Sequence, residues 1–201
     1  MRNTVHIFMF SVIMMVGISE GAPNTLQRGN SRHRTPSPNN PNHRFHKLCR
    51  IAHNEYRRKH HAPPLKTNST LYIMARGWAH QLAIRDDPSK VTHQPGSGFG
   101  ENIYWMSLSE APYEKYAKMA VDAWYEEKVN YTYVPGGYSP ATAHFTQMVW
   151  IATTEVGCGY NVSKSQTIYV VCNYSPQGNI EGEYEKNVKP PLSSIMSYVH
   201  P

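Results

Sequence analysis

Two segments near the C-terminal end of the 201-residue chain each carry one cysteine inside an apolar run. The runs 156–162 and 167–174 have the composition of strands, and a short polar turn near Ser165 separates them. Cys158 and Cys172 are equidistant from Ser165, so a hairpin centred there places them opposite each other, at a separation that a disulfide can span. The sequence therefore predicts a cross-linked β-hairpin.

The segments before this hairpin predict helices and one further strand. Apolar residues recur every three or four positions, as in helices, over 45–56, 71–82 and 109–127. Residues 102–107 suit a strand, and for 144–150 a short helix is favoured over a strand. Cys49 falls on the apolar face of the first helix, where we expect a buried free thiol rather than an intermolecular bridge or a reactive thiol.

The first 44 residues differ in composition from the rest. Arg2, an apolar run over 7–18 and small residues before a cut after Gly21 predict a secretory signal over 1–21, with an uncleaved signal anchor as the alternative. The run is too short for a comfortable membrane span, and no other segment resembles a transmembrane helix. Residues 22–44 read as a disordered basic linker rich in Pro and Asn, before one domain over 45–191 and a tail over 192–201. We expect a secreted, extracellular protein.

Charge is unevenly distributed along the chain. Of the net +6, residues 23–47 contribute +5, and the part from Leu48 onward has 14 basic and 13 acidic residues, which is +1. A nucleic-acid surface needs clustered basic residues on the folded domain, so we expect no nucleic-acid partner. A solvated linker is favoured for the basic segment over contact with anionic lipid or glycans.

The third helical pattern separates two adjacent carboxylates. Glu127 shares a face with Tyr116 and Trp124, whereas Glu126 falls on the opposite side. A carboxylate that points inward needs a partner or a shifted pKa. Glu127 is therefore the candidate site residue.

Histidines recur every seven residues at His46, His53 and His60. Two helical turns separate neighbours by about 10.5 Å, too far for one ion to bind two of them. We interpret the series as a helix face on which His53 makes structural hydrogen bonds. The chain has no His-Glu-x-x-His zinc motif and no Gly-x-Ser-x-Gly nucleophile elbow.

Four sequons fit the N-glycosylation pattern. We expect Asn68, Asn130 and Asn161 to be candidates, whereas Asn173 lies in a presumed strand and is not expected to be used.

Four ordered motifs resemble the CAP superfamily, also called the SCP or SCP/TAPS domain. They are His53-Asn54-x-x-Arg57, Gly100-Glu101-Asn102-Ile103, the 143–150 segment Ala-His-Phe-Thr-Gln-Met-Val-Trp and the 169–180 segment around Cys172-Asn173-Tyr174. The superfamily includes cysteine-rich secretory proteins, antigen 5 venom allergens and plant pathogenesis-related protein 1. Residues 60–65 and 184–191 look most like its Golgi-associated plant pathogenesis-related group, although the signal segment and the two hairpin cysteines look like the secreted, venom allergen-like members.

The resemblance implies an α+β fold, a three-layer α-β-α sandwich with a central antiparallel sheet and a large cleft. Two His and two Glu line the family's cleft, and His93, Glu101, Glu127 and His144 match those positions. The two His, His93 and His144, can hold zinc or another divalent cation, which we do not expect to be obligatory, while the carboxylates Glu101 and Glu127 orient them or bind a water. Ala143 stands where the family usually has Gly or a charged residue, which affects local cleft polarity.

Three hypotheses about function follow from the resemblance and the signal segment. The leading one is a non-enzymatic extracellular binding protein for a sterol, a fatty acid or a protein partner, modulated by the cleft ion. The alternatives are a hydrolase or protease that uses the four cleft residues, with Ser107 nearby, and a purely protein-binding, immunomodulatory module. The oligomeric state stays open, a homodimer included.

Overall fold

The computed structural model describes residues 41–108 and 112–191. The expected signal segment 1–21, most of the expected linker 22–44 and the tail 192–201 lie outside these residues. Within the described part, no helix is both long enough and apolar enough to cross a membrane.

The sheet has four strands in the order β1-β3-β4-β2. They are β1 (Lys66–Thr67), β2 (Gly100–Ser107), β3 (Glu155–Val162) and β4 (Thr167–Ser175). The pairs β3–β4 and β2–β4 are antiparallel, as expected, but the two-residue β1 pairs parallel to β3, so the sheet is mixed. So short a strand has no periodicity that sequence could reveal.

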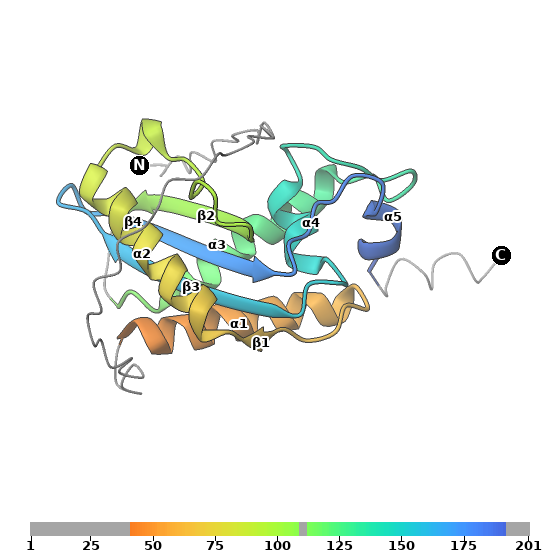
Figure 1. Ribbon diagram of the computed structural model, residues 1–201, viewed down its shortest axis with the longest axis horizontal. Coiled ribbons are helices and arrows are strands. Elements are labelled where there is room, and N and C mark those ends of the chain that lie inside the picture. The colour runs from red at the N-terminus through yellow and green to blue at the C-terminus, as the bar shows by residue number, and fades with distance from the viewer. Residues whose placement is uncertain (1–40, 109–111, 192–201) are drawn as a thin grey trace, which may run out of the picture.

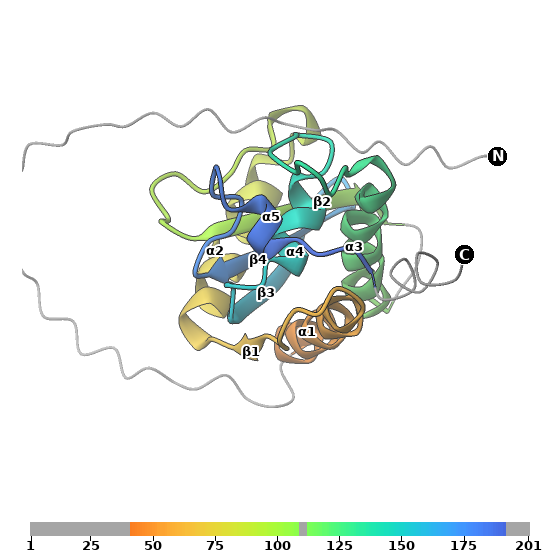
Figure 2. The same cartoon turned by 90° about the vertical axis from the view of Figure 1, so that its right-hand side faces the viewer.

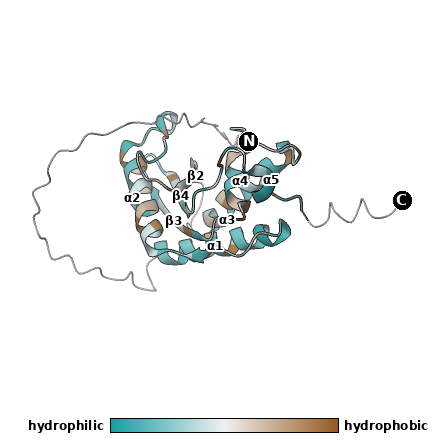
Figure 3. Cartoon of the chain, turned by 45° about the vertical axis from the view of Figure 1, so that its right-hand side comes forward, coloured by the Kyte–Doolittle hydropathy of each residue, from teal (hydrophilic) through white to brown (hydrophobic). Residues whose placement is uncertain are grey.

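Helices cover both faces of this sheet and make the expected three-layer α-β-α sandwich (Figures 1 and 2). The helix α2 (Ser69–Arg85) lies on one face, over a small core that includes Trp78, Leu82, Tyr169 and Val171. On the other face, α1 (Pro41–Lys59) and α3 (Lys115–Glu126) enclose a larger core. Hydrophilic and hydrophobic residues share the same helices (Figure 3), as expected of amphipathic helices that pack on one side only.

The boundaries of two helices differ from the prediction. The helix α1 begins at Pro41, so the last four residues of the expected linker are helical, and Asn42 Oδ1 accepts a hydrogen bond from the Tyr160 amide. The helix α3 begins at Lys115, after the non-helical residues 112–114, and the expected start near Ser109 lies outside the described residues. For α1, this contact with β3 lies outside the helix, so apolar periodicity could not indicate it.

Short helices complete the fold. A 3-10 turn, η1 (Pro88–Lys90), follows α2, and a second, η2 (Glu127–Asn130), follows α3 directly. The helix α4 (Ala143–Val149) confirms the helix expected over 144–150, and α5 (Tyr184–Asn187) lies near the end of the described chain.

The predicted disulfide is confirmed. Cys158 and Cys172 are partners in the β3–β4 register and are bonded, and Cys49 on α1 is a buried free thiol. All three lie on the side of the sheet that faces α1 and α3.

The four sequon asparagines differ in accessibility. Asn130 is exposed at the end of η2, whereas the Asn161 side chain is half-buried beside His80. The Asn68 side chain caps α2 and also donates to Glu155, so glycosylation there would compete with the cap. Asn173 is fully buried, which agrees with the expectation that its sequon is not used.

Candidate functional site

His93 and Glu101 form the first of two histidine–carboxylate pairs. His93 lies in the loop after η1, and Glu101 is the second residue of β2. The His93 Nδ1 lies 2.7 Å from Glu101 Oε1, which also accepts the Gln94 backbone N–H at 3.0 Å. The Glu101 side chain is 5% exposed and that of His93 is 36% exposed. A buried carboxylate therefore orients an imidazole ring that reaches solvent.

Glu127 and His144 form the second pair. Glu127 opens η2 on the inward side of the chain, as predicted, and its neighbour Glu126 is exposed. The Glu127 Oε1 lies 2.7 Å from His144 Nδ1, while its Oε2 accepts the backbone N–H groups of His144 and Phe145 at 3.0 and 3.1 Å. These are first-turn amides of α4, and the residue before that helix, Thr142, provides no side-chain cap. Glu127 therefore caps α4 and orients His144 at the same time.

Residues at the start of β2 anchor both pairs. Asn102, next to Glu101, donates from Nδ2 to the His144 carbonyl at 3.1 Å. The Trp124 ring stacks on the His144 ring, with centroids 6.2 Å apart, and its Nε1 donates to the Ile103 carbonyl at 3.3 Å. Three consecutive residues of β2 thus contact the two histidines. Glu101 and Asn102 do so by direct hydrogen bonds, and Ile103 does so through the Trp124 side chain.

Gly100 lets α4 approach this strand closely. A Cβ at position 100 would collide with the Gln147 side chain, whose Oε1 accepts the Gly178 amide at 2.8 Å and whose Nε2 donates to Thr153. The glycine in the Gly-Glu-Asn-Ile motif is therefore explained by packing.

The hydrogen bonds determine what the imidazoles can do. Because each Nδ1 faces a carboxylate, it carries the proton, and each neutral ring keeps its Nε2 lone pair for a metal ion or a donor. Within the described ranges, the one group of three or more potential ligands within 4.8 Å of one another is formed by three cysteines, not by His93, Glu101, Glu127 and His144. The four residues therefore form two separate hydrogen-bonded pairs, and no three of them lie close enough to make a three-ligand metal centre.

Ser107 does not belong to this site. Glu101 and Ser107 lie at opposite ends of the eight-residue β2. Six residues of extended strand separate them by about 20 Å. The expectation that Ser107 could serve the four residues as a nearby nucleophile is wrong, because the strand carries it to the far end of the sheet.

Asn173 is a site neighbour that the sequence did not indicate. It pairs with Glu101 in the β2–β4 register, which places the two side chains on one face of the sheet. Asn173 is fully buried with neither side-chain polar atom bonded, and Glu101 Oε2 is also buried without a partner. A polar residue inside an otherwise apolar strand was the available signal.

Known proteins are similar to this chain in sequence and in fold. Residues 51–174 match the model of the "CAP: Cysteine-rich secretory protein family". Golgi-associated plant pathogenesis-related protein 1 of Homo sapiens is 38% identical over 152 residues, which are 73% of this chain and 94% of that protein. The secreted protein RBT4 of Candida albicans is 35% identical over 144 residues, which are 69% of this chain but only 36% of that protein.

A solved structure titled "Crystal structure of NaASP2 with Zn2+" has the same fold, with a TM-score of 0.61 over 80% of this chain and 94% of that chain at 24% identity. The match of the family model over more than half of the sequence, and the human relative over nearly its whole length, lead to one conclusion. The chain belongs to the CAP family of cysteine-rich secretory proteins.

Proposed function

We propose that this chain is an exported CAP-domain binding protein that carries a small apolar ligand, a sterol or a fatty acid, and whose two His–Glu pairs bind an exchangeable divalent cation. The observation that carries the ion-binding part is the pairing of each His Nδ1 with a buried carboxylate, which leaves both Nε2 atoms as ligands. Export is inferred from the signal-like segment 1–21. The lipid ligand is inferred from family membership.

Direct titration tests the ion-binding part. We expect zinc, the ion that neutral imidazoles and carboxylates suit well, to bind the purified chain, and His93→Ala or His144→Ala to weaken binding at least tenfold. The exposed His80 on α2 provides the control, and His80→Ala should leave affinity unchanged. Equal affinity in all four proteins would remove the ion from the proposal.

Co-purifying lipids test the ligand. Mass spectrometry of the exported protein, followed by titration with a labelled sterol and a labelled fatty acid, should give saturable binding of at least one of them. No binding of either class would leave a protein partner as the ligand, which is the protein-binding alternative.

The rival function is hydrolysis by the same four residues. In the described part of the chain, neither pair is hydrogen-bonded to a Ser, Thr or Cys side chain that could act as a nucleophile. A metal-activated water would be the remaining nucleophile. Cleavage of a peptide or ester library that is abolished by both Glu101→Gln and His144→Ala would favour this rival.

A further inference from the structure

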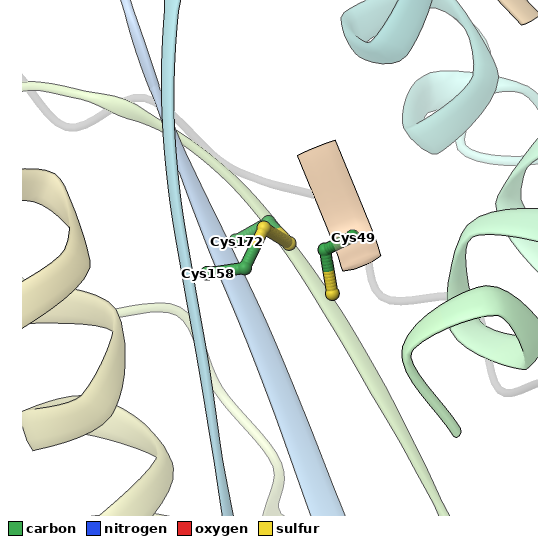
Figure 4. A group of neighbouring side chains, drawn as sticks. All are labelled: Cys49, Cys158 and Cys172. Carbon is green, nitrogen blue, oxygen red and sulfur yellow. A yellow bond between two sulfur atoms is a disulfide. The ribbon is translucent and has the colours of Figure 1, made fainter. Parts of the chain in front are cut away.

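Three cysteine sulfurs meet in the interior between α1 and the sheet (Figure 4). The Sγ atoms of Cys49, Cys158 and Cys172 all lie within 4.8 Å of one another, and all three residues are fully buried. Cys158 and Cys172 form the bridge across the β3–β4 hairpin, and Cys49 is free. The proposed function uses none of these sulfurs.

Two kinds of chemistry suit three adjacent sulfurs. A metal ion would need the bridge to be reduced and three thiolates to be buried, and no His, Asp or Glu of the described chain completes the cluster as a fourth ligand. Such a complex would place net negative charge in an apolar core, which is costly. Exchange between a thiol and a disulfide begins and ends with one bridge and one thiol, so it leaves the net charge unchanged and needs no reductant.

We propose that Cys49 is an internal exchange partner of the Cys158–Cys172 bridge, so that the disulfide can move from the hairpin to a link between α1 and the sheet. The Cys49 thiolate attacks one bridge sulfur, for example Cys158 Sγ. The electron pair of the broken S–S bond goes to Cys172 Sγ, which leaves as a thiolate and takes up the proton that Cys49 lost. Attack on Cys172 Sγ releases Cys158 in the same way.

The surroundings of Cys49 make this exchange slow in the closed fold. Its thiol donates weakly to the Ala117 carbonyl of α3, with Sγ 3.8 Å from the oxygen. Burial raises the pKa of Cys49 well above the ordinary value, so the reactive thiolate is scarce. Exchange between the adjacent sulfurs is therefore slow at neutral pH, and its rate rises with pH as the thiolate fraction grows.

The moved bridge would act on a helix that supports the candidate site. Arg57, two turns beyond Cys49 on α1, donates to the carbonyls of Met148 and Trp150 at 2.9 and 2.8 Å. These residues lie at the end of α4, the helix that carries His144. A covalent link from α1 to β3 or β4 would thus restrain the helix that holds α4.

Peptide mapping of the oxidised full chain tests the proposal. The chain is incubated without denaturant at pH 8.5, samples are alkylated at successive times, and the protein is digested without reduction. We expect a growing fraction of peptides that join Cys49 to Cys158 or Cys172, with alkylation of the released cysteine. Finding only the Cys158–Cys172 bridge, with all alkylation at Cys49, would overturn the proposal.

A relocated thiol distinguishes proximity from burial. Ala52 is buried in the same core one turn along α1, so the double variant Cys49→Ala with Ala52→Cys keeps a buried thiol on the same helix but removes it from the cluster. We expect exchange to be lost in this variant. Exchange as fast as in the wild type would mean that general unfolding exposes any thiol, and the proposal would fail.

Single-cysteine removal gives a second, independent measurement. After Cys172→Ala or Cys158→Ala, two thiols remain, and oxidised glutathione should join them through Cys49 in at least one variant. If circular dichroism shows both variants folded and both keep two free thiols, Cys49 is not an exchange partner.

Discussion

At the scale of single residues, Glu127 shows how one side chain can serve stability and chemistry together. One carboxylate oxygen accepts a hydrogen bond from His144 Nδ1, and the other accepts hydrogen bonds from two backbone amides at the start of α4. The Glu101 carboxylate differs, because its Oε2 is buried without a partner. Glu127 thus caps a helix and Glu101 does not, so we expect removal of the two carboxylates to affect folding differently.

Replacement of Glu127 by Ala should destabilise the fold. Three hydrogen bonds to a charged, buried acceptor would be lost and two amides left uncapped, so we expect the free energy of unfolding to fall by about 2–4 kcal/mol. The exposed neighbour provides a control, since Glu126→Ala should change it by less than about 0.5 kcal/mol. Urea denaturation measures both, and similar values for the two variants would contradict the capping role.

Helical periodicity predicted which of the two adjacent carboxylates points inward, because that depends on spacing within one helix. It could not predict that Glu127 reaches His144, which follows 17 residues later in a different helix. The anchors Asn102 and Trp124 were missed as site residues for the same reason. Their hydrogen-bond partners are backbone carbonyls brought close by the fold. Every residue has a backbone carbonyl, so the sequence does not indicate which one serves as a partner.

At the scale of elements, α2 rests directly on β3 because two glycines remove the side chains between them. A Cβ at Gly157 would collide with the backbone of Leu71 and Tyr72, and a Cβ at Gly159 would come within 2.8 Å of the Arg76 backbone. Each contact involves main chain, which cannot rotate away. Close packing of the helix on this strand therefore depends on the absence of side chains at both positions.

The same substitution at two glycines should have opposite effects. Gly157→Ala forces α2 from the sheet, and we expect a loss of about 3 kcal/mol or more in the free energy of unfolding. Gly77 lies on the exposed side of α2, and a Cβ added there would meet nothing within 4 Å, so Gly77→Ala should stabilise the helix by about 0.5–1 kcal/mol. Thermal unfolding followed by circular dichroism compares the two, and a shift in the same direction for both would contradict this account of packing.

The hairpin was the element that sequence determined best. Its turn, register and disulfide all follow from the positions of Cys158 and Cys172 around one polar turn, a local relation. The strand β1 could not be predicted, because its two residues join the sheet only through pairing with β3 across a long stretch of chain. The strand order β1-β3-β4-β2 was likewise not predicted, because no spacing in the sequence records which strands lie side by side.

At the scale of the whole molecule, three buried histidines of α1 form hydrogen bonds to other parts of the fold. His46 accepts the Cys158 amide and lies 3.0 Å from Thr67 Oγ1, and His53 bonds the Cys49 carbonyl and the Tyr174 hydroxyl. His60 pairs with the Lys189 carbonyl and the Tyr125 hydroxyl. In each ring one nitrogen can donate and the other accept, so all three are satisfied as neutral imidazoles. The heptad is thus structural, as the spacing predicted.

Stability should therefore decrease in mild acid. Burial lowers the pKa of His46 and of His53 to about 4, from 6.5, and lowers that of His60. Between pH 6.5 and 4 the unfolded chain binds protons at these rings and the folded chain does not, so the free energy of unfolding falls as the pH falls. The stabilisation is complete above pH 6.5, and below it each of His46 and His53 removes up to about 1.4 kcal/mol per pH unit.

Denaturant titrations at pH 7, 6 and 5 measure this slope before most carboxylates titrate. His53→Gln keeps a polar side chain at the position but has no proton to gain in this range, so the variant should be less stable at pH 7 yet lose less stability between pH 6.5 and 5 than the wild type does. The matched change His80→Gln, on the exposed side of α2, should leave the slope as it is. A wild-type slope that survives His53→Gln unchanged would show that other groups, and not this buried face of α1, determine the acid sensitivity of the fold.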